Sequence, residues 1–289
     1  MEIKKSRIKA AIFGGDKRLR TVAARLGRIA DVMTWCVPDT PDHPNGWKEA
    51  AREADLIVLP LPVTADGIRL NIQRSIEAPT LTEIIDKAKK TVVVAAGKVP
   101  PVIKQYAAEA GVRLADYFEL EEVQIKNAVP TAEGAVEIAM RELPRTVMGA
   151  KAAVIGYGRV GRTLARTLTA LKADVTCAAR SEKDLAWSAV DGCRAVPLAK
   201  FTANPPELDV IFNTVPSLIL SADVIARLRR KPLIIDLAAS PGGTDFRAAD
   251  EAGIKAVLAT ALPGKTSPET AGEIIADAIV SLLEKEAIL

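Results

Sequence analysis

The sequence is poor in histidine and cysteine. It has 289 residues, with a single histidine, His43, and three cysteines, Cys36, Cys177 and Cys193. The cysteine number is odd and no CxxC pair occurs, which argues against a disulfide scaffold and favours a reducing compartment. With one histidine, which stands in a turn-rich stretch, we expect neither a metal site nor a catalytic histidine.

The sequence also lacks a charge excess of one sign and a long apolar run. Thirty-nine Lys and Arg balance 36 Asp and Glu, for a net charge of +3, and the basic residues are scattered. A nucleic-acid-binding surface would need a larger, one-sided cluster, so we expect no nucleic-acid partner. No apolar run approaches the roughly 18 residues of a membrane span, and the N-terminal stretch has no apolar signal core. We therefore expect a cytoplasmic protein that does not enter the membrane.

Short apolar segments alternate with longer amphipathic ones along the whole chain, which predicts an α/β fold with parallel sheets covered on both faces. The pattern starts twice with a strand, a glycine turn and a helix, so we expect two Rossmann-like domains in series. Strands are predicted at 8–14, 32–37, 56–61, 91–96, 112–115, 152–155, 174–178, 210–214, 232–237 and 256–258, and helices at 19–29, 101–110 and 161–171.

A further helix is predicted at 130–143, where Thr131 can cap its start and apolar residues recur at helical spacing. We interpret it as a bridge between a substrate domain, 1–129, and a nucleotide domain, 130–289, with a cleft between them. The last helix, 268–289, can instead pack back on the first domain.

A glycine loop follows the predicted strand 152–155 and opens a helix. Its first glycine permits the turn, the second lets a pyrophosphate approach the backbone, and the third allows close helix packing. The phosphates would meet free N–H groups at the helix start. The loop therefore predicts a dinucleotide site; it consists of Gly156, Tyr157, Gly158, Arg159, Val160 and Gly161.

The end of the next strand indicates which dinucleotide binds. An NAD site normally has Asp or Glu here, to hold the ribose 2′-hydroxyl. This chain has Ala179, Arg180 and Ser181 instead. A guanidinium and a hydroxyl suit a 2′-phosphate, which predicts NADP. The alternative is that Arg180 is an ordinary surface charge.

Later strand ends in the second half are expected to line the nicotinamide side, because ligands bind at the carboxyl ends of parallel strands. We also expect a contributing loop at 262–272, ahead of the last helix. The residues predicted to contact the cofactor there are Asn213, Thr214, Val215, Pro216, Asp236, Pro263 and Gly264.

In the first half, the glycine turn at 14–18 lacks the full dinucleotide fingerprint. Its backbone N–H groups and Arg18 could instead hold a carboxylate, with Asp16 beside them; a plain structural turn is the alternative. Asn127, Thr131 and Glu133 lie where the halves join, and polar residues at a domain junction are candidates for substrate contact. Glu133 could act as a general base if partly buried, or be a first-turn acid favoured by the helix dipole.

Several strings resemble the A subunit of dipicolinate synthase over nearly the whole chain, in order. They are Gly-Gly-Asp-x-Arg (14–18), Asn-Ala-Val-Pro-Thr-Ala-Glu-Gly (127–134), Ala-Arg-Ser (179–181), Asn-Thr-Val-Pro-Ser (213–217), Asp-Leu-Ala-Ala-Ser-Pro-Gly-Gly-Thr-Asp-Phe (236–246) and Leu-Pro-Gly-x-x-x-Pro-x-Thr-Ala-Gly (262–272). The stretch 39–89 is the least similar.

This resemblance implies NADP-dependent oxidation of dihydrodipicolinate, or its hydrated precursor, to dipicolinate, the pyridine-2,6-dicarboxylate of bacterial spores. It also implies a partner, a flavoprotein-like B subunit, and we expect a homo-oligomer. On this interpretation Arg18 and the turn amides hold one carboxylate of the small dicarboxylate substrate, Asn127 and Thr131 make polar contacts, and Glu133 is the base.

Two alternatives remain open. One is another NADP-linked dehydrogenase, acting on a hydroxy acid or a shikimate-like acid. The absence of histidine after His43 weighs against a hydroxy-acid enzyme, which needs a catalytic histidine late in the chain. The other is a regulatory protein that binds NADP without turnover, an alternative that the scarcity of obvious acid–base groups leaves open.

Overall fold

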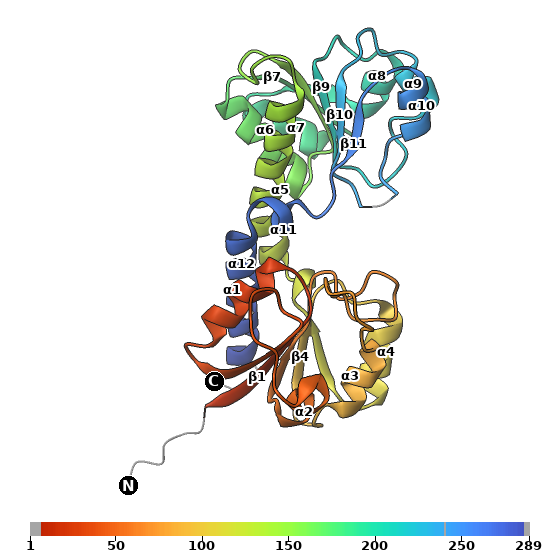
Figure 1. The fold of residues 1–289 in the computed structure, drawn as a ribbon. Helices are drawn as coiled ribbons and strands as arrows, with labels where there is room; N and C mark the ends of the chain where they lie inside the picture. The colour runs from red at the N-terminus through yellow and green to blue at the C-terminus, as the bar shows by residue number, and fades with distance from the viewer. Residues whose placement is uncertain (1–6, 240, 286–289) are drawn as a thin grey trace. The chain divides into compact units, whose positions relative to one another are not determined.

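The computed structural model describes residues 7–239 and 241–285. The chain forms two compact units (Figure 1). The first domain contains the chain up to Lys126 together with the segment that starts at Pro268, and the second domain contains Asn127–Ser267. The chain thus crosses between the domains at 126/127 and again at 267/268, rather than passing through them once in series.

The first domain is built on a five-stranded parallel sheet in the order β2-β1-β3-β4-β5. In this doubly wound order the strand order reverses between β1 and β3, and ligands bind at such switch points, beyond the carboxyl ends of the strands. The strands are β1 (Ile8–Phe13), β2 (Ala30–Trp35), β3 (Leu56–Val58), β4 (Val93–Ala96) and β5 (Arg113–Asp116).

Both faces of this sheet are covered, because side chains along each strand alternate between two buried clusters. Ile12 and Val58 point to the face packed by α1 (Lys17–Leu26) and α12 (Pro268–Lys285). Phe13 and Ile57 point to the opposite face, which is packed by α2 (Gly46–Glu53), α3 (Leu81–Lys87) and α4 (Pro101–Glu109). A short 3₁₀ turn, η1 (Tyr117–Glu119), follows β5.

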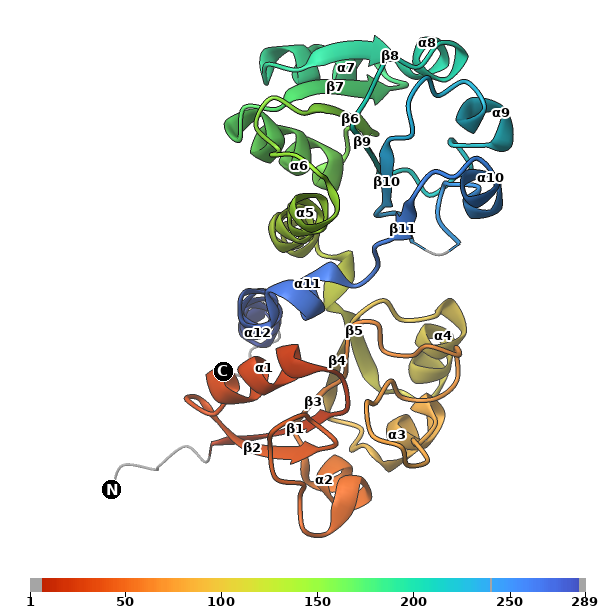
Figure 2. The same cartoon turned by 45° about the horizontal axis from the view of Figure 1, so that its top comes forward.

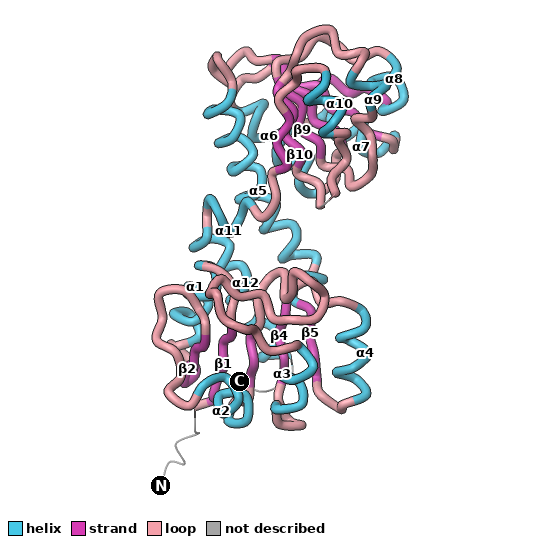
Figure 3. Tube along the Cα trace, turned by 45° about the vertical axis from the view of Figure 1, so that its right-hand side comes forward, coloured by secondary structure: helices cyan, strands magenta, loops and turns pink. Residues whose placement is uncertain are grey.

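Helix α12 lies beside α1, as Figures 1 and 3 show, although more than 240 residues separate them in the sequence. Arg25 of α1 pairs with Asp277 of α12 at 2.7 Å, and Ile275 and Ile279 are buried in the first core. The C-terminal helix therefore packs on the first domain, the arrangement that the sequence left open. Residues 286–289 of the predicted helix lie outside the described part.

The second domain holds a six-stranded parallel sheet in the order β11-β10-β9-β6-β7-β8 (Figure 2). This is the Rossmann order, with its switch point between β6 and β9. The predicted α/β class with two parallel sheets is confirmed. The strands are β6 (Lys151–Ile155), β7 (Asp174–Ala179), β8 (Arg194–Pro197), β9 (Val210–Asn213), β10 (Leu233–Asp236) and β11 (Ala256–Leu258).

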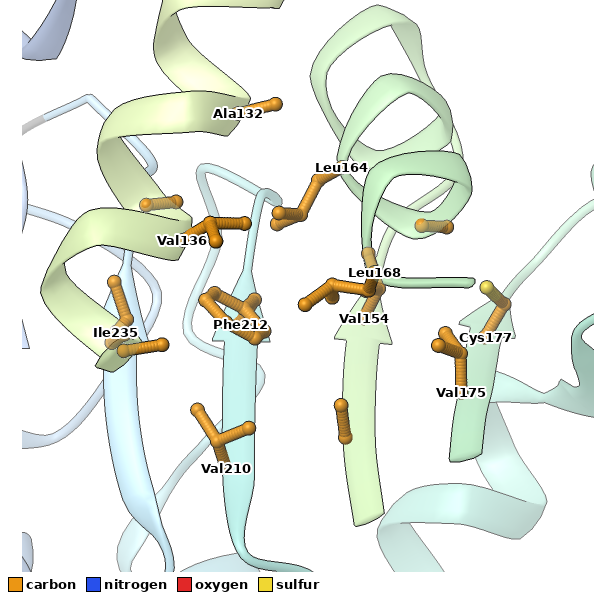
Figure 4. Packing of buried hydrophobic residues seen from close by; sticks show 14 of the residues in the cluster. Ala132, Val136, Val154, Leu164, Leu168, Val175, Cys177, Val210, Phe212 and Ile235 are labelled. Carbon is orange, nitrogen blue, oxygen red and sulfur yellow. The ribbon is translucent and has the colours of Figure 1, made fainter. Parts of the chain in front are cut away.

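The core of the second domain has two layers. In one, Phe212 and Val154 meet Leu164 of α6 (Arg159–Ala170) and Val136 of α5 (Glu121–Glu142) (Figure 4). α7 (Glu182–Val190) also contributes to this layer. The opposite face is packed by α8 (Leu198–Ala203), α9 (Ala222–Ile225) and α10 (Phe246–Glu251). Because the strands are parallel, their carboxyl ends lie at one edge of the second sheet, and the candidate site is at that edge.

Helix α5 corrects the predicted bridge. It begins at Glu121, not at residue 130, and Pro130 lies inside it. Thr131 is no N-cap, since its hydroxyl donates to the carbonyl of Asn127 at 2.8 Å, one turn back within the helix. The proline removes one backbone hydrogen bond, but the helix continues past it, and its neighbours Ala128 and Ala132 are buried by packing.

Two further features differ from the sequence expectations. The loop expected at 262–272 begins with a short helix, α11 (Leu262–Thr266). Strand β8 and several helices of four to nine residues were not predicted, because such short segments carry little periodicity. None of the helices in the described ranges is long and apolar enough to cross a membrane.

Candidate functional site

The glycine loop of the second domain has the geometry that a dinucleotide phosphate requires. Gly156 adopts φ +91°, and a Cβ there would lie 2.4 Å from the Thr214 hydroxyl. A Cβ on Gly161 would lie 2.2 Å from the Gly156 carbonyl. At Gly158, the N-cap of α6, a Cβ would meet nothing within 4 Å. Two glycines therefore serve packing, whereas Gly158 leaves open space at a helix N-terminus, which fits a pyrophosphate.

Tyr157, in the same loop, points inward. Its side chain is buried, and its hydroxyl donates to Asp191 at 2.8 Å. Burial and this hydrogen bond raise the pKa of Tyr157, which stays a phenol. Burial opposes ionisation of Asp191, but hydrogen bonds from Tyr157 and Arg162 outweigh it and lower its pKa. Only the backbone of Tyr157 can thus contact a nucleotide. Helix α6 begins with exposed Arg159 and half-buried Val160.

The end of β7 presents a cation and no carboxylate. Ala179 is buried at the strand end, and Arg180 directly after it is exposed. The hydroxyl of Ser181 accepts a hydrogen bond from the Asp184 amide at 3.1 Å and caps α7. Ser181 therefore has a structural role that the sequence pattern did not indicate, and its hydroxyl hydrogen remains a donor beside Arg180.

Asn213 and Asp236, at the ends of β9 and β10, are both fully buried and bind each other. The Asp236 carboxylate also accepts from the amides of Ala238 and Gly243 and from the Thr244 hydroxyl, at 2.7–3.0 Å. Every oxygen of the carboxylate is thus engaged by the protein. Asp236 therefore holds the ends of β9 and β10 together, and a direct cofactor contact of its carboxylate stays a prediction.

The remaining predicted cofactor residues fall into two groups. The Thr214 hydroxyl donates to the Ile155 carbonyl at 2.8 Å, and Val215 packs against Gly156, so this segment supports the glycine loop. Pro216 follows and is exposed. Pro263 is buried in α11 and Gly264 is half-buried beside it, so the segment is more ordered than the expected loop.

In the first domain, the turn after β1 is closed by the chain itself. The Gly14 amide donates to the Trp35 carbonyl and the Gly15 amide to the Asn71 carbonyl, each at 2.8 Å. The prediction that these two amides hold a carboxylate is therefore wrong, because residues distant in sequence already occupy them.

Buried Arg18 and half-buried Asp16 form an ion pair in the same turn. The Asp16 carboxylate caps α1 and accepts three side-chain hydrogen bonds from Arg18, two from Nε at 2.8 and 3.1 Å and one from Nη2 at 2.8 Å. Nη2 also donates to the Leu61 carbonyl. Arg18 is only 7% exposed. Its guanidinium thus links α1 to the segment after β3, at the switch point of the first sheet.

The three junction residues share one helix, α5, but differ in setting. Asn127 and Thr131 are half-buried and joined by the hydrogen bond already described. Glu133 is exposed, so the partial burial on which its role as a base depended is absent.

Three residues that hold these turns and strand ends in place belong to no motif that the sequence analysis recognised. Asn71 closes the Gly14–Gly15 turn, Asp191 holds Tyr157, and Asp116 accepts amide hydrogen bonds at the end of β5. Of the three, only Asp116 could have been recognised from the sequence, because it is a carboxylate directly after the predicted strand 112–115.

The fold and the glycine loop define a two-domain, dehydrogenase-type oxidoreductase with a nicotinamide dinucleotide site. A model of the D-isomer specific 2-hydroxyacid dehydrogenase NAD binding domain matches residues 123–240. A transhydrogenase from Sinorhizobium meliloti, 16% identical, has the same fold with a TM-score of 0.70 over 96% of this chain and 94% of that one.

More specific matches cover nearly the whole chain. A model of the N-terminal domain of the dipicolinate synthase A subunit matches residues 9–118. The A subunit of Bacillus subtilis dipicolinate synthase is 33% identical over 96% of both chains. The solved A subunit from Bacillus halodurans, also 33% identical, superposes with a TM-score of 0.86 over 96% of this chain and 98% of that one. The chain belongs to the family of dipicolinate synthase A subunits.

Proposed function

We propose that this protein catalyses NADP-dependent oxidation of dihydrodipicolinate, or of its hydrated tetrahydro precursor, to dipicolinate during spore formation. The observation that carries the proposal is the match to the A subunit of dipicolinate synthase along 96% of the chain, with a glycine loop of fitting geometry. Loss of a hydride and a proton from the dihydro ring gives an aromatic pyridine, so the protein mainly has to position the ring and its two carboxylates.

The choice of NADP over NAD rests on the end of β7. When bound, the nicotinamide supplies the hydride acceptor in either case. The ribose 2′-phosphate would meet the exposed guanidinium of Arg180 and the hydroxyl of Ser181, at a strand end where Ala179 stands in place of a carboxylate. An NAD ribose would find no carboxylate for its 2′-hydroxyl at positions 179–181.

For the substrate, we propose Arg18 as one carboxylate ligand and Asn127 and Thr131 as further polar contacts. Arg18 lies at the switch point of the first sheet, where its pairing with Asp16 and Leu61 holds the guanidinium in place. These bonds use Nε and Nη2, which leaves Nη1 to donate a charge-assisted hydrogen bond to a carboxylate. The exposure of Glu133 removes the support for a base at that position.

We also propose that the protein forms a homo-oligomer and works with a second, flavoprotein-like B subunit. The support for the B subunit is that the relatives are named as the A subunits of their enzymes.

The proposal is tested with the purified chain, freshly prepared dihydrodipicolinate and NADP, with and without a B subunit. We expect NADPH and dipicolinate to form together in equal amounts, which absorbance and chromatography follow. If no NADPH forms in either mixture while NADP still binds, the chain is a nucleotide-binding protein without turnover.

A further inference from the structure

Lys98 has an unusual backbone conformation at the carboxyl end of β4. It follows Gly97 and adopts φ +58°, in the left-handed region that disfavours residues with a Cβ. A glycine would adopt this conformation at lower cost. The fold alone therefore has no need of a lysine at this position, and the side chain calls for another explanation.

A second lysine in the described part of the chain shows the contrast. Lys172 also has a left-handed backbone, with φ +60°. It stands two residues after the last residue of α6, where a cation is favoured by the negative end of the helix dipole. Lys98 follows a strand, so no helix end accounts for its charge.

The backbone that carries Lys98 is fixed by its surroundings. The Asp116 carboxylate, whose side chain is 3% exposed, accepts from the amides of Lys98 and Val99 at 2.9 and 2.8 Å. A Cβ on Gly97 would lie 2.7 Å from the Tyr117 ring and 2.8 Å from the Leu61 side chain. A rigid base therefore presents the lysine at the edge of the sheet.

The side chain of Lys98 is exposed, and within the described ranges its ammonium forms no ion pair. Lys104, by contrast, pairs with Asp116 and Glu119. The Lys98 backbone is thus fixed at the carboxyl edge of the first sheet, and among the described residues no acid pairs with its ammonium.

Lys98 and Arg18 are anchored to the same segment. Arg18 donates to the Leu61 carbonyl, the Gly97 amide donates to the Pro60 carbonyl, and the Val63 amide donates to the Gly97 carbonyl. Arg18 follows β1 in the chain and Lys98 follows β4, and in the sheet β3 lies between these two strands. Two strand spacings, about 10 Å, separate their strands, and long side chains can span that distance toward the two ends of a small ring.

We propose that Lys98 binds the second carboxylate of a planar dicarboxylate substrate, the first being held at Arg18. This assignment rests on the proposed function and deepens it, since it makes Lys98 the residue that distinguishes a dicarboxylate from a monocarboxylate. An ammonium point charge and a carboxylate form a charge-assisted hydrogen bond that a monocarboxylate ligand could not make.

The test measures binding of pyridine-2,6-dicarboxylate and pyridine-2-carboxylate to the full chain by calorimetry, in the presence of NADP. The wild type should prefer the dicarboxylate. Lys98→Gln should weaken dicarboxylate binding about tenfold or more and leave the monocarboxylate little changed, whereas Lys98→Arg should restore most of the preference. NADP binding should not change.

Two further variants make the result specific. Lys172→Gln removes a lysine of the same backbone conformation from the other domain and should leave both affinities unchanged. Lys98→Gly suits the left-handed backbone, so it should fold at least as well as the wild type and still lose the preference.

Dicarboxylate binding within about twofold of wild type in Lys98→Gln, or an equal loss of both ligands, would overturn the assignment. If the wild type reduces NADP with dihydrodipicolinate, such a result removes only the role of Lys98. A wild type that neither binds the dicarboxylate nor reduces NADP overturns the proposed function and this inference with it.

Discussion

The side-chain amide of Asn213 donates to the carboxylate of Asp236 at 3.0 Å, and both residues are fully buried at the carboxyl ends of β9 and β10. Because Asp236 also accepts hydrogen bonds from two backbone amides and a hydroxyl, it ties Ala238, Gly243 and Thr244 to the ends of β9 and β10. A residue that the sequence pattern assigns to cofactor contact thus organises the strand ends from within.

Replacing Asp236 should therefore destabilise the second domain. Asp236→Ala leaves several buried donors unsatisfied, each costing about 1–3 kcal/mol, so we expect a loss of at least about 3 kcal/mol in the free energy of unfolding. Urea denaturation followed by circular dichroism measures it. Exposed Asp250, on α10 of the same domain, supplies the control variant Asp250→Ala, which should stay within about 0.5 kcal/mol. A stable Asp236→Ala protein that loses only NADP affinity would instead favour direct cofactor contact.

The glycine loop should respond differently at two of its glycines. Gly161→Ala places a Cβ 2.2 Å from the Gly156 carbonyl, and we expect destabilisation of at least about 2 kcal/mol. Gly158→Ala meets no protein atom within 4 Å, so the fold should survive while NADP binding weakens about tenfold or more, because the methyl group occupies the phosphate space. Thermal unfolding and fluorescence titration with NADPH separate the two effects. Full NADPH affinity in Gly158→Ala would place the pyrophosphate elsewhere.

Arg180 should set the preference for NADP. Arg180→Ala should weaken NADP binding by about 1.5–3 kcal/mol, roughly ten- to a hundredfold, because it removes a charge-assisted hydrogen bond to the 2′-phosphate. NAD binding should hardly change. Arg194→Ala, which removes an exposed arginine from the amino end of neighbouring β8, is the matched control and should affect neither. Equal weakening of NADP and NAD in Arg180→Ala would mean that the guanidinium does not recognise the 2′-phosphate.

Replacing Arg18 should weaken substrate binding and lower the stability of the first domain, but leave nucleotide binding unchanged. Arg18→Ala leaves Asp16 and the Leu61 carbonyl without their partner, and we expect a stability loss of about 1–3 kcal/mol. At a temperature where the variant is folded, KM for dihydrodipicolinate should rise about tenfold or more while the NADP dissociation constant stays constant. Steady-state kinetics and calorimetry test both parts. A parallel loss of NADP binding would show that Arg18 serves the fold or the cofactor.

Much of the architecture follows from local sequence patterns. Buried strands such as 152–155 and 210–213 are short apolar runs bounded by turns, and their alternation with amphipathic helices predicts parallel sheets without knowledge of any contact. The glycine loop is equally local, because turn, phosphate approach and helix packing depend on glycines at a fixed spacing. The absence of a carboxylate after β7 could be recognised for the same reason.

The sequence by itself therefore determined the fold class, the dinucleotide loop and the cation at the end of β7. Only the tertiary structure decided which polar groups remain available for a ligand. The Gly15 amide donates to the Asn71 carbonyl, and the Asp236 carboxylate accepts from Asn213, so both groups already have partners within the protein. Asp116 fixes the backbone of Lys98, whose side chain is exposed. These partners are 18–56 residues apart in the chain, and hydrogen bonds across such separations leave no periodic trace in a sequence.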